Sequence, residues 1–218
     1  MTTTTADPPV FDSAIARAGA GLPATLTITD DRGVRHRVDP AAWCRDHLPG
    51  DRGLLTRCAG PTLDVGCGPG RLTRALNRLG HPALGIDVSA AAVRLARLRG
   101  ATALRRDVFD PLPGHGRWRH LLLADGNIGI GGDPEALLRR CRDLLAREGR
   151  LHVELARPGT RTWAGDARLH DEAGHPGTPF RWAQLAAGEL AAVADASALR
   201  VLAEWTEADR WFATLTPA

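Results

Sequence analysis

A cluster of glycines directly after a short apolar stretch is the most informative chemical feature of this sequence. The run from Leu63 to Gly70 reads LDVGCGPG, so a buried strand leads into a glycine-rich turn and then into the start of a helix. Gly66 permits a sharp exit from the strand, Gly68 lets a ligand approach the backbone, and Gly70 lets the helix pack closely. The turn is therefore predicted to bind a small ligand.

Acidic residues mark three successive predicted strands. Asp64 directly precedes a GxGxG spacing, which suits a ligand with a cationic amino-acid end better than a pyrophosphate. Asp87 ends the second strand, where a carboxylate can accept both ribose hydroxyls of an adenosine. Asp107 ends the third and can accept from an adenine amino group, while Val108 or Phe109 lines the ring. One such acid could be a simple turn former, but three beside the glycines favour a binding crevice.

A parallel sheet covered by helices is needed to bring these acids together. After Pro61 the sequence alternates short apolar runs with helical patterns, which is the order typical of such a sheet. Ser89 and Asp133 are good N-caps, and Pro134 suits a first helical position. The predicted strands are Thr62–Val65, Ala83–Val88, Ala103–Arg106, His120–Ala124 and Leu151–Leu155. The predicted helices run over Arg71–Leu79, from Ser89 to Gly100, and from Pro134 up to Gly149, the last with an apolar stripe of Leu137, Leu138, Cys141, Leu144 and Leu145.

The flanking regions carry weaker signals. Met1–Pro9 is rich in Thr and Pro and reads as a disordered or loosely attached start. No periodicity persists over 156–181, so we expect a long functional or mobile loop there, followed by a helix near Trp182–Ala196. Hairpins are predicted within Leu26–Val38 and from Ala198–Glu207 to Arg210–Thr216. We divide the chain into a tail and cap over 1–59 and a main α/β domain over 60–218.

Composition narrows the class of protein. Hydrophobic residues make up 44% and charged residues 24%, as in ordinary globular domains. No apolar run approaches a membrane span and no secretory signal is recognisable, so we expect a cytoplasmic protein. The net charge is +3, and acidic residues are interspersed among the basic ones with no basic block, which disfavours nucleic-acid binding. The four cysteines are Cys44, Cys58, Cys67 and Cys141. They show neither a CxxC pair nor a His-Cys metal spacing, so neither a disulfide framework nor a metal site is predicted.

These motifs resemble those of the class I S-adenosylmethionine-dependent methyltransferases. Leu63–Arg71 is similar to their first signature, Asp87 to their ribose-binding acid and Asp107-Val108 to their adenine-contacting pair, and the resemblance extends from Pro61 to the C-terminus. The segment 123–134 is similar to small actinobacterial members. The resemblance implies a Rossmann-like α/β fold with a seven-stranded, mostly parallel sheet whose last strand is antiparallel and inserted, beside the small N-terminal cap. It also implies S-adenosyl-L-methionine as cofactor and S-adenosyl-L-homocysteine as product, with cofactor-binding residues Asp64, Gly66, Cys67, Gly68, Gly70, Arg71, Asp87, Val88, Asp107, Val108, Phe109 and Asp125.

The catalytic side is less sharply defined. A sulfonium methyl is already activated, so the protein must mainly align a nucleophile and, where needed, remove a proton. Asp125, Asn127 and His170 are our candidates for this role, although a solvated loop position is the commoner role for a histidine. His36, His47 and His175 are weaker candidates, and His170-Asp171-Glu172 lacks the spacing of a helical metal motif. Trp43, Trp163 and Trp182 could stack on an aromatic acceptor, whereas Trp205 and Trp211 are expected in the core.

The leading hypothesis is methyl transfer to oxygen, nitrogen or carbon of a small molecule, with secondary metabolism as one setting. Asp125-Gly126-Asn127 stands where nucleobase amino-methyltransferases carry [DN]-P-P-[YF], so nucleobase methylation is disfavoured. One alternative is a cofactor-binding protein without methyl transfer, or one repurposed for another reaction. Another is a nicotinamide-dependent oxidoreductase, whose phosphate loop prefers GxGxxG. The sequence leaves monomer and homodimer open.

Overall fold

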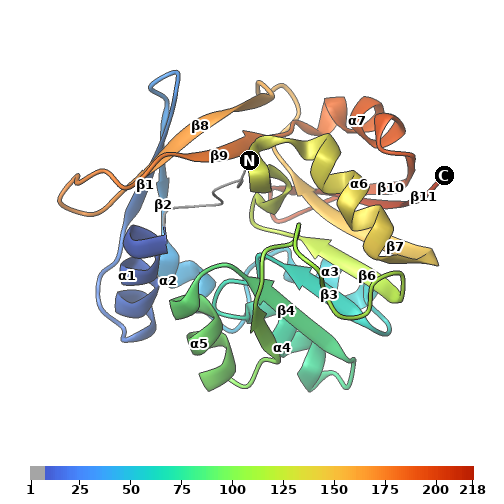
Figure 1. Cartoon of the computed structure of the whole chain (residues 1–218), viewed down its shortest axis with the longest axis horizontal. Coiled ribbons are helices and arrows are strands. Elements are labelled where there is room, and N and C mark those ends of the chain that lie inside the picture. The colour runs from blue at the N-terminus through green and yellow to red at the C-terminus, as the bar shows by residue number, and fades with distance from the viewer. Residues whose placement is uncertain (1–7) are drawn as a thin grey trace.

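Two sheets and the helices around them make up residues 8–218, the part of the chain that the computed structural model describes (Figure 1). The predicted loose start lies outside the described residues for positions 1–7. It is wrong for Pro8 and Pro9, because these residues begin α1 (Pro8–Gly19). Two prolines at the start of a helix are tolerated, since the first turn has no intrahelical partner for their missing N–H groups.

The large sheet has seven strands in the order β10-β11-β7-β6-β3-β4-β5. The strands β7, β6, β3, β4 and β5 pair in parallel, and β11 lies antiparallel between β10 and β7. This confirms the predicted fold with its inserted antiparallel last strand. The bounds are β3 (Thr62–Val65), β4 (Ala83–Asp87), β5 (Ala103–Arg105), β6 (Trp118–Leu123), β7 (Leu145–Leu155), β10 (Leu199–Glu207) and β11 (Arg210–Pro217).

The predicted helix caps form the hydrogen bonds expected of them. The Ser89 hydroxyl accepts from the N–H of Ala92 at 2.9 Å, and the Asp133 carboxylate accepts from the N–H of Ala136 at 3.0 Å. Each cap satisfies a backbone donor that the first helical turn leaves unpaired. The helices are α2 (Pro40–Trp43), α3 (Asp51–Arg57), α4 (Arg71–Arg78), α5 (Ala90–Leu98), α6 (Pro134–Leu144) and α7 (Leu190–Ala196), with short 3-10 turns η1 (Asn127–Gly132) and η2 (Ala187–Glu189).

A second, four-stranded sheet forms, together with α1 and α2, what we call the cap. It has the order β2-β1-β8-β9 and is antiparallel throughout, and its strands are β1 (Leu26–Asp30), β2 (Arg35–Val38), β8 (Trp163–His170) and β9 (Phe180–Gln184). The N-terminal hairpin is thus confirmed. Since β1 and β2 precede residue 60 and β8 and β9 follow it, strand pairing crosses the boundary that we drew at 59/60, which stays a prediction.

The loop predicted over 156–181 and the helix predicted near Trp182–Ala196 are both wrong in part. Strands β8 and β9 occupy much of this region, and the helix begins only at Leu190. Along β8, buried positions do alternate with more exposed ones, but they are filled by Gly165, Ala167 and Leu169. Glycine and alanine have a low propensity for strands and are only weakly apolar, so the sequence does not indicate a strand here.

The apolar core lies mainly between the large sheet and its helices, and it includes the predicted apolar stripe. The predicted end of this helix is wrong, because α6 ends at Leu144 and Leu145 begins β7. Trp205 and Trp211, expected in the core, are half-buried and pack against its edges. The small sheet and α1 lie to one side of the large sheet (Figure 1). Among the described residues, no helix is long and apolar enough to cross a membrane.

Candidate functional site

The glycine-rich turn after β3 adopts a backbone that only glycines accommodate well. Gly66 and Gly68 have φ values of 72° and 52°, in the left-handed region that is costly for other residues. A Cβ on Gly66 would lie 2.6 Å from the Asn127 amide nitrogen, and one on Gly70 would lie 2.8 Å from the Cβ atoms of Ala96 and Ala101. A Cβ on Gly68 would meet nothing within 4 Å. Gly66 and Gly70 therefore permit close packing, while Gly68 leaves open space for a ligand.

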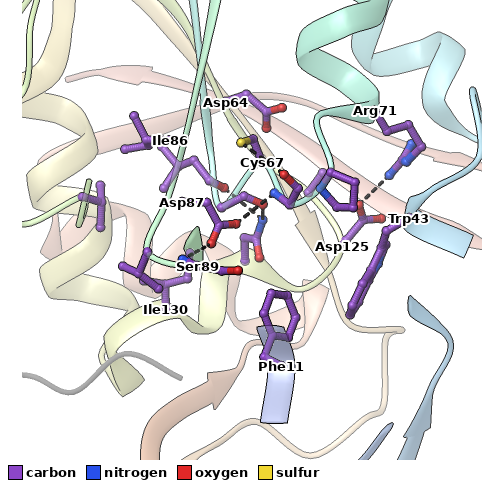
Figure 2. Close-up of a pocket in the computed structure, with 18 of the residues that line it drawn as sticks. Phe11, Trp43, Asp64, Cys67, Arg71, Ile86, Asp87, Ser89, Asp125 and Ile130 are labelled. Carbon is purple, nitrogen blue, oxygen red and sulfur yellow. Dashed lines mark hydrogen bonds and ion pairs between the residues drawn. The ribbon is translucent and has the colours of Figure 1, made fainter. Parts of the chain in front are cut away.

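Asp87 at the end of β4 holds this turn in place. One carboxylate oxygen accepts from the N–H of Gly68 at 2.9 Å, and the other accepts from the N–H of Ser89 at 2.8 Å. Burial raises the pKa of Asp87, while these backbone hydrogen bonds oppose the shift. Asp87 lines the cavity beside the turn (Figure 2). Because each carboxylate oxygen has two lone pairs, Asp87 can still accept from hydroxyl groups of a ligand.

Asp64 is buried beneath the turn, where it joins β3 to α4. One of its oxygens accepts from the Thr73 hydroxyl at 2.7 Å and from the Thr73 N–H at 3.2 Å. Burial raises the pKa of Asp64 to about 6. Burial also raises the pKa of the Cys67 thiol, so Cys67 is a packing residue of the cavity wall and not a reactive thiolate.

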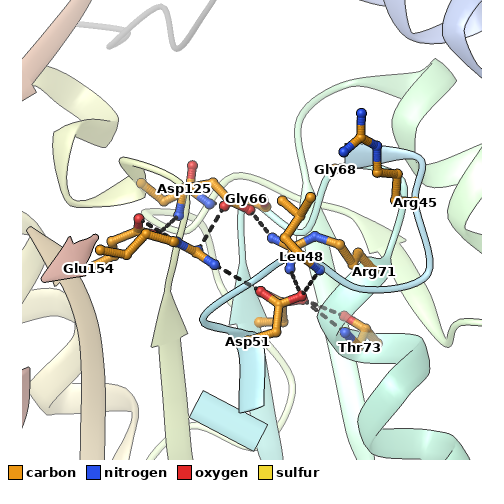
Figure 3. Close-up of polar contacts among 12 residues, drawn as sticks. Arg45, Leu48, Asp51, Gly66, Gly68, Arg71, Thr73, Asp125 and Glu154 are labelled. Carbon is orange, nitrogen blue, oxygen red and sulfur yellow. Dashed lines mark hydrogen bonds and ion pairs between the residues drawn. The ribbon is translucent and has the colours of Figure 1, made fainter. Parts of the chain in front are cut away.

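Five charged side chains form one network of ion pairs, and Figure 3 labels four of them, Asp51, Arg71, Asp125 and Glu154. Arg71 pairs with Asp51 and, at 2.5 Å, with Asp125. Arg210 pairs with Asp51 at 3.0 Å, with Asp125 at 3.1 Å and with Glu154 at 2.7 Å. Glu154 also accepts from the backbone N–H of Asp125 at 2.6 Å. Three carboxylates face two guanidinium groups, so the network as a whole carries one net negative charge when all five are ionised.

Arg71 and Asp125 are the members of this network that line the cavity. Arg71 is 4% exposed, and its Nε has no hydrogen-bond partner among the described residues. An unsatisfied buried donor is costly. Burial raises the pKa of Asp125, while Arg71 and Arg210 act in the opposite direction. Asp125 is thus fixed between two guanidinium groups instead of lying free as a base.

Asn127 supports the glycine turn from the other side. Its amide nitrogen donates to the carbonyls of Val65 and Gly66, each at 2.9 Å. Both amide hydrogens are therefore directed at the backbone of the turn. This geometry gives Asn127 a positioning role, and its predicted part in catalysis stays a prediction.

The opposite wall of the same cavity comes from the cap and is apolar. It is lined by Phe11 of α1, Trp43 of α2, and residues of the cap strands, namely Leu26, Ile28, Val38, Leu169, Phe180 and Trp182. The rings of Phe11 and Trp43 lie 5.9 Å apart, and those of Phe180 and Trp182 also lie 5.9 Å apart, edge to face. The cavity therefore joins a polar wall of glycines and acids to an aromatic wall.

The described lining of this cavity contains no histidine. His170 ends β8, where its Nδ1 lies 3.4 Å from the Gly174 carbonyl, and it lines neither described cavity. His175 is exposed and contacts Asp171 at 3.1 Å. His36 lines a second cavity, next to Glu154, Trp163 and Trp182. The structure thus does not bring His170 to the other candidate catalytic residues.

Most predicted cofactor-binding residues do come together. Phe109 is an exception, because it is 38% exposed and its ring packs near Gly131 instead of lining the cavity. Gly70 packs behind the turn. Ile86 and Ile130, which are not among the predicted residues, add apolar surface to the cavity on the side of the glycine turn. The predicted residues that line the cavity are Asp64, Gly66, Cys67, Gly68, Arg71, Asp87, Val88, Asp107, Val108 and Asp125.

Comparisons with known proteins agree with this geometry. Residues 62–149 match the methyltransferase domain family. A curated relative, the ubiquinone biosynthesis O-methyltransferase of Chelativorans sp. (strain BNC1), is 27% identical over 130 residues, which are 54% of this chain and 51% of the relative. The chain thus spans about half the length of that relative.

Solved structures share the fold. A SAM-dependent methyltransferase from Bacteroides fragilis, in complex with S-adenosyl-L-homocysteine, matches 100% of this chain and 98% of its own with 22% identity and a TM-score of 0.83. The 1,6-didemethyltoxoflavin-N1-methyltransferase of Burkholderia thailandensis matches 97% of this chain and 80% of its own with 17% identity and a TM-score of 0.51. The first match covers the cap as well as the large sheet.

Proposed function

We propose that this chain, a class I methyltransferase by its matched domain and its fold, binds S-adenosylmethionine and transfers the methyl group to a small-molecule acceptor. The observation that carries the proposal is the single cavity with two chemically different walls. The polar wall suits the cofactor and the aromatic wall suits an acceptor. When bound, the cofactor supplies an activated methyl group at its sulfonium centre.

The residues of the polar wall fit the two ends of this cofactor. Asp87 is available to accept from the ribose hydroxyls, and Val108 and Asp107 flank the space for the adenine. At the other end, the guanidinium group of Arg71 lines the cavity and suits a carboxylate, and the net negative charge of the ion network suits an ammonium group near Asp125. The open space above Gly68 would let the cofactor approach the backbone between them.

The aromatic wall favours a planar, largely apolar acceptor. Phe180, Trp182 and Trp43 offer ring faces and edges for stacking, with geometry that fixes how an acceptor lies. The described lining contributed by the cap has no ionisable side chain, and Asp125 is held by two guanidinium groups. We therefore propose an acceptor whose nucleophile needs no strong base, such as an amine or a phenol or enol of low pKa.

The atom that receives the methyl group is open within this class. The curated relative is named as an O-methyltransferase and one structural neighbour as an N1-methyltransferase, so both oxygen and nitrogen are reasonable acceptors. Secondary metabolism and a cytoplasmic location stay predictions. A protein that binds the cofactor without transferring the methyl group is the second candidate, because no free base is aimed at the aromatic wall.

A turnover assay separates these two candidates. Purified protein would be incubated with S-adenosylmethionine and a panel of aromatic phenols and heteroaromatic amines, and S-adenosylhomocysteine release would be measured. We expect release that depends on one acceptor class and falls in Trp182→Ala without loss of cofactor affinity. Cofactor binding with no release across acceptors that bind the protein would favour the non-catalytic candidate.

A further inference from the structure

A buried group of one thiol and two imidazoles lies apart from the residues that line either described cavity. It consists of Cys58, which follows α3, His120 on β6, and His152 on β7. Cys58 and His152 are 0% exposed, and His120 is 7% exposed. One potential ligand atom of each residue lies within 4.8 Å of the others, and among the described residues no other such group was found.

The two imidazoles face each other across a short gap. His120 Nδ1 and His152 Nε2 lie 3.2 Å apart, a hydrogen-bond distance when one of them carries the proton, and the ring planes are nearly parallel, at 17°. Two nitrogens on one tetrahedral zinc ion with Zn–N near 2.05 Å are about 3.3 Å apart, so an ion that replaces this proton requires little change in their separation.

The second ring nitrogen of His152 has a partner of the kind that orients metal-binding histidines. Its Nδ1 lies 2.9 Å from the Thr214 hydroxyl. A metal-binding histidine usually has its second nitrogen bonded to an oxygen in this way, which fixes the ring and the tautomer.

We propose that Cys58, His120 and His152 bind one zinc ion, with a non-protein ligand in the fourth position. One thiolate and two imidazoles are ligands that zinc prefers, and three protein ligands are the number found in zinc sites with an open position. On binding, the Cys58 thiol loses its proton to solvent as the sulfur–zinc bond forms, and no oxidation or reduction takes place.

The ion would tie the end of α3 to the large sheet. Cys58 directly follows α3, and α3 begins with Asp51, which pairs with Arg71 and Arg210 in the ion network. The two histidines lie on neighbouring parallel strands of the large sheet (Figure 1). Zinc bound to the folded state alone would therefore raise the melting temperature and hold the start of the network in place.

Cobalt(II) titration of the full chain, expressed without a histidine tag and purified with a chelator, tests this site. We expect one Co²⁺ per chain, with visible ligand-field bands and a near-ultraviolet thiolate-to-cobalt band, both removed by one equivalent of Zn²⁺. Cys58→Ser should abolish the thiolate band and weaken zinc binding at least about tenfold. The matched controls are Cys141→Ser, at another buried thiol, and Cys44→Ser. Each should leave the thiolate band and the zinc affinity unchanged.

A second variant covers the case in which Cys58→Ser fails to fold. Thr214→Val keeps all three ligands, so it should keep the thiolate band but weaken zinc affinity about 10- to 100-fold, because His152 loses its orienting partner. Absence of the band in the wild-type protein would overturn the proposal, and so would a band that survives Cys58→Ser. Titration with S-adenosylhomocysteine on the same samples reports separately on the cofactor site.

Discussion

Replacement of Arg210 by methionine tests whether the buried ion network holds α3, β7 and β11 together. The guanidinium group donates two hydrogen bonds to Glu154, at 2.9 and 2.7 Å, and one to Asp125 at 3.1 Å. It donates two more toward α3, to Asp51 and to the Pro49 carbonyl, each at 3.0 Å. The side chain is only 16% exposed, so solvent cannot replace these contacts without rearrangement.

The size of the loss follows from what Arg210→Met leaves behind. Asp51, Asp125 and Glu154 would face Arg71 as the one remaining guanidinium of the network, and Asp51 is only 3% exposed. Breaking a buried ion pair by removing one partner typically costs about 3–5 kcal/mol. Methionine keeps an apolar stem to pack against Phe212, over whose ring the guanidinium lies. The expected loss therefore reports mainly on charge and hydrogen bonding.

Urea unfolding at neutral pH, followed by circular dichroism, measures this loss. We expect Arg210→Met to lower the free energy of unfolding by about 3–5 kcal/mol, with an unchanged denaturant slope. The matched control is Arg139→Met, because Arg139 is 46% exposed and pairs with Glu135 at 3.7 Å, and such surface pairs contribute below about 1 kcal/mol. If Arg210→Met were no more harmful than Arg139→Met, the network would not have the structural role that we assign to it.

Three further changes test the cofactor wall. Asp87→Asn should weaken S-adenosylhomocysteine binding by about 1–3 kcal/mol, measured by calorimetry, because a charge-assisted acceptor for the ribose is lost; unchanged affinity would remove Asp87 from the site. Gly68→Ala should cost about 1–2 kcal/mol of stability in the left-handed conformation, seen in urea unfolding, and should weaken cofactor binding more than tenfold, since the new Cβ occupies the open space above the turn; full affinity would show that the cofactor lies elsewhere. Burial raises the pKa of Asp64 from 3.8 to about 6, so the folded state holds the proton more tightly than the unfolded state. The stability of the wild type relative to Asp64→Asn should therefore fall by about 3 kcal/mol as the pH rises from below 4 to above 6; urea unfolding across this range checks it, and a flat difference would contradict the buried carboxyl.

Local patterns explain why the large sheet could be predicted from the sequence. The glycine turn, the caps Ser89 and Asp133, and the apolar runs of β3, β4 and β6 are each encoded within about ten residues. Strand ends at one edge of a parallel sheet then bring Asp64, Asp87 and Asp107 to the same cavity. The acidic part of the site therefore follows from short-range signals and one general rule of topology.

The cap sheet depends on pairing between distant segments and could not be predicted in the same way. Strand β8 pairs with β1, so Thr27 lies opposite His170, and the small residues along β8 hide its alternation. Arg210, Glu154 and Asp51 likewise come from separate elements and carry no shared spacing. Glu154 is the exception, because it lies near the end of β7 as the other acids lie at the ends of their strands, and this position predicts a place at the same edge of the sheet.

The buried thiol and imidazoles illustrate the same limit. Cys58, His120 and His152 are far apart in sequence and no short metal-binding spacing connects them, so the sequence alone predicts no metal site. Parallel pairing of β6 and β7 and the packing of α3 bring them together. Three-dimensional contact is the only feature that connects these residues.

Calorimetric titration of the purified chain with S-adenosylmethionine, S-adenosylhomocysteine and NAD is the most direct test of the central claim. Our account predicts saturable binding of the first two at one site per chain and no binding of NAD. Preference for NAD, or no binding of either S-adenosyl compound by folded protein, would contradict the assignment of the glycine turn and its acids to this cofactor.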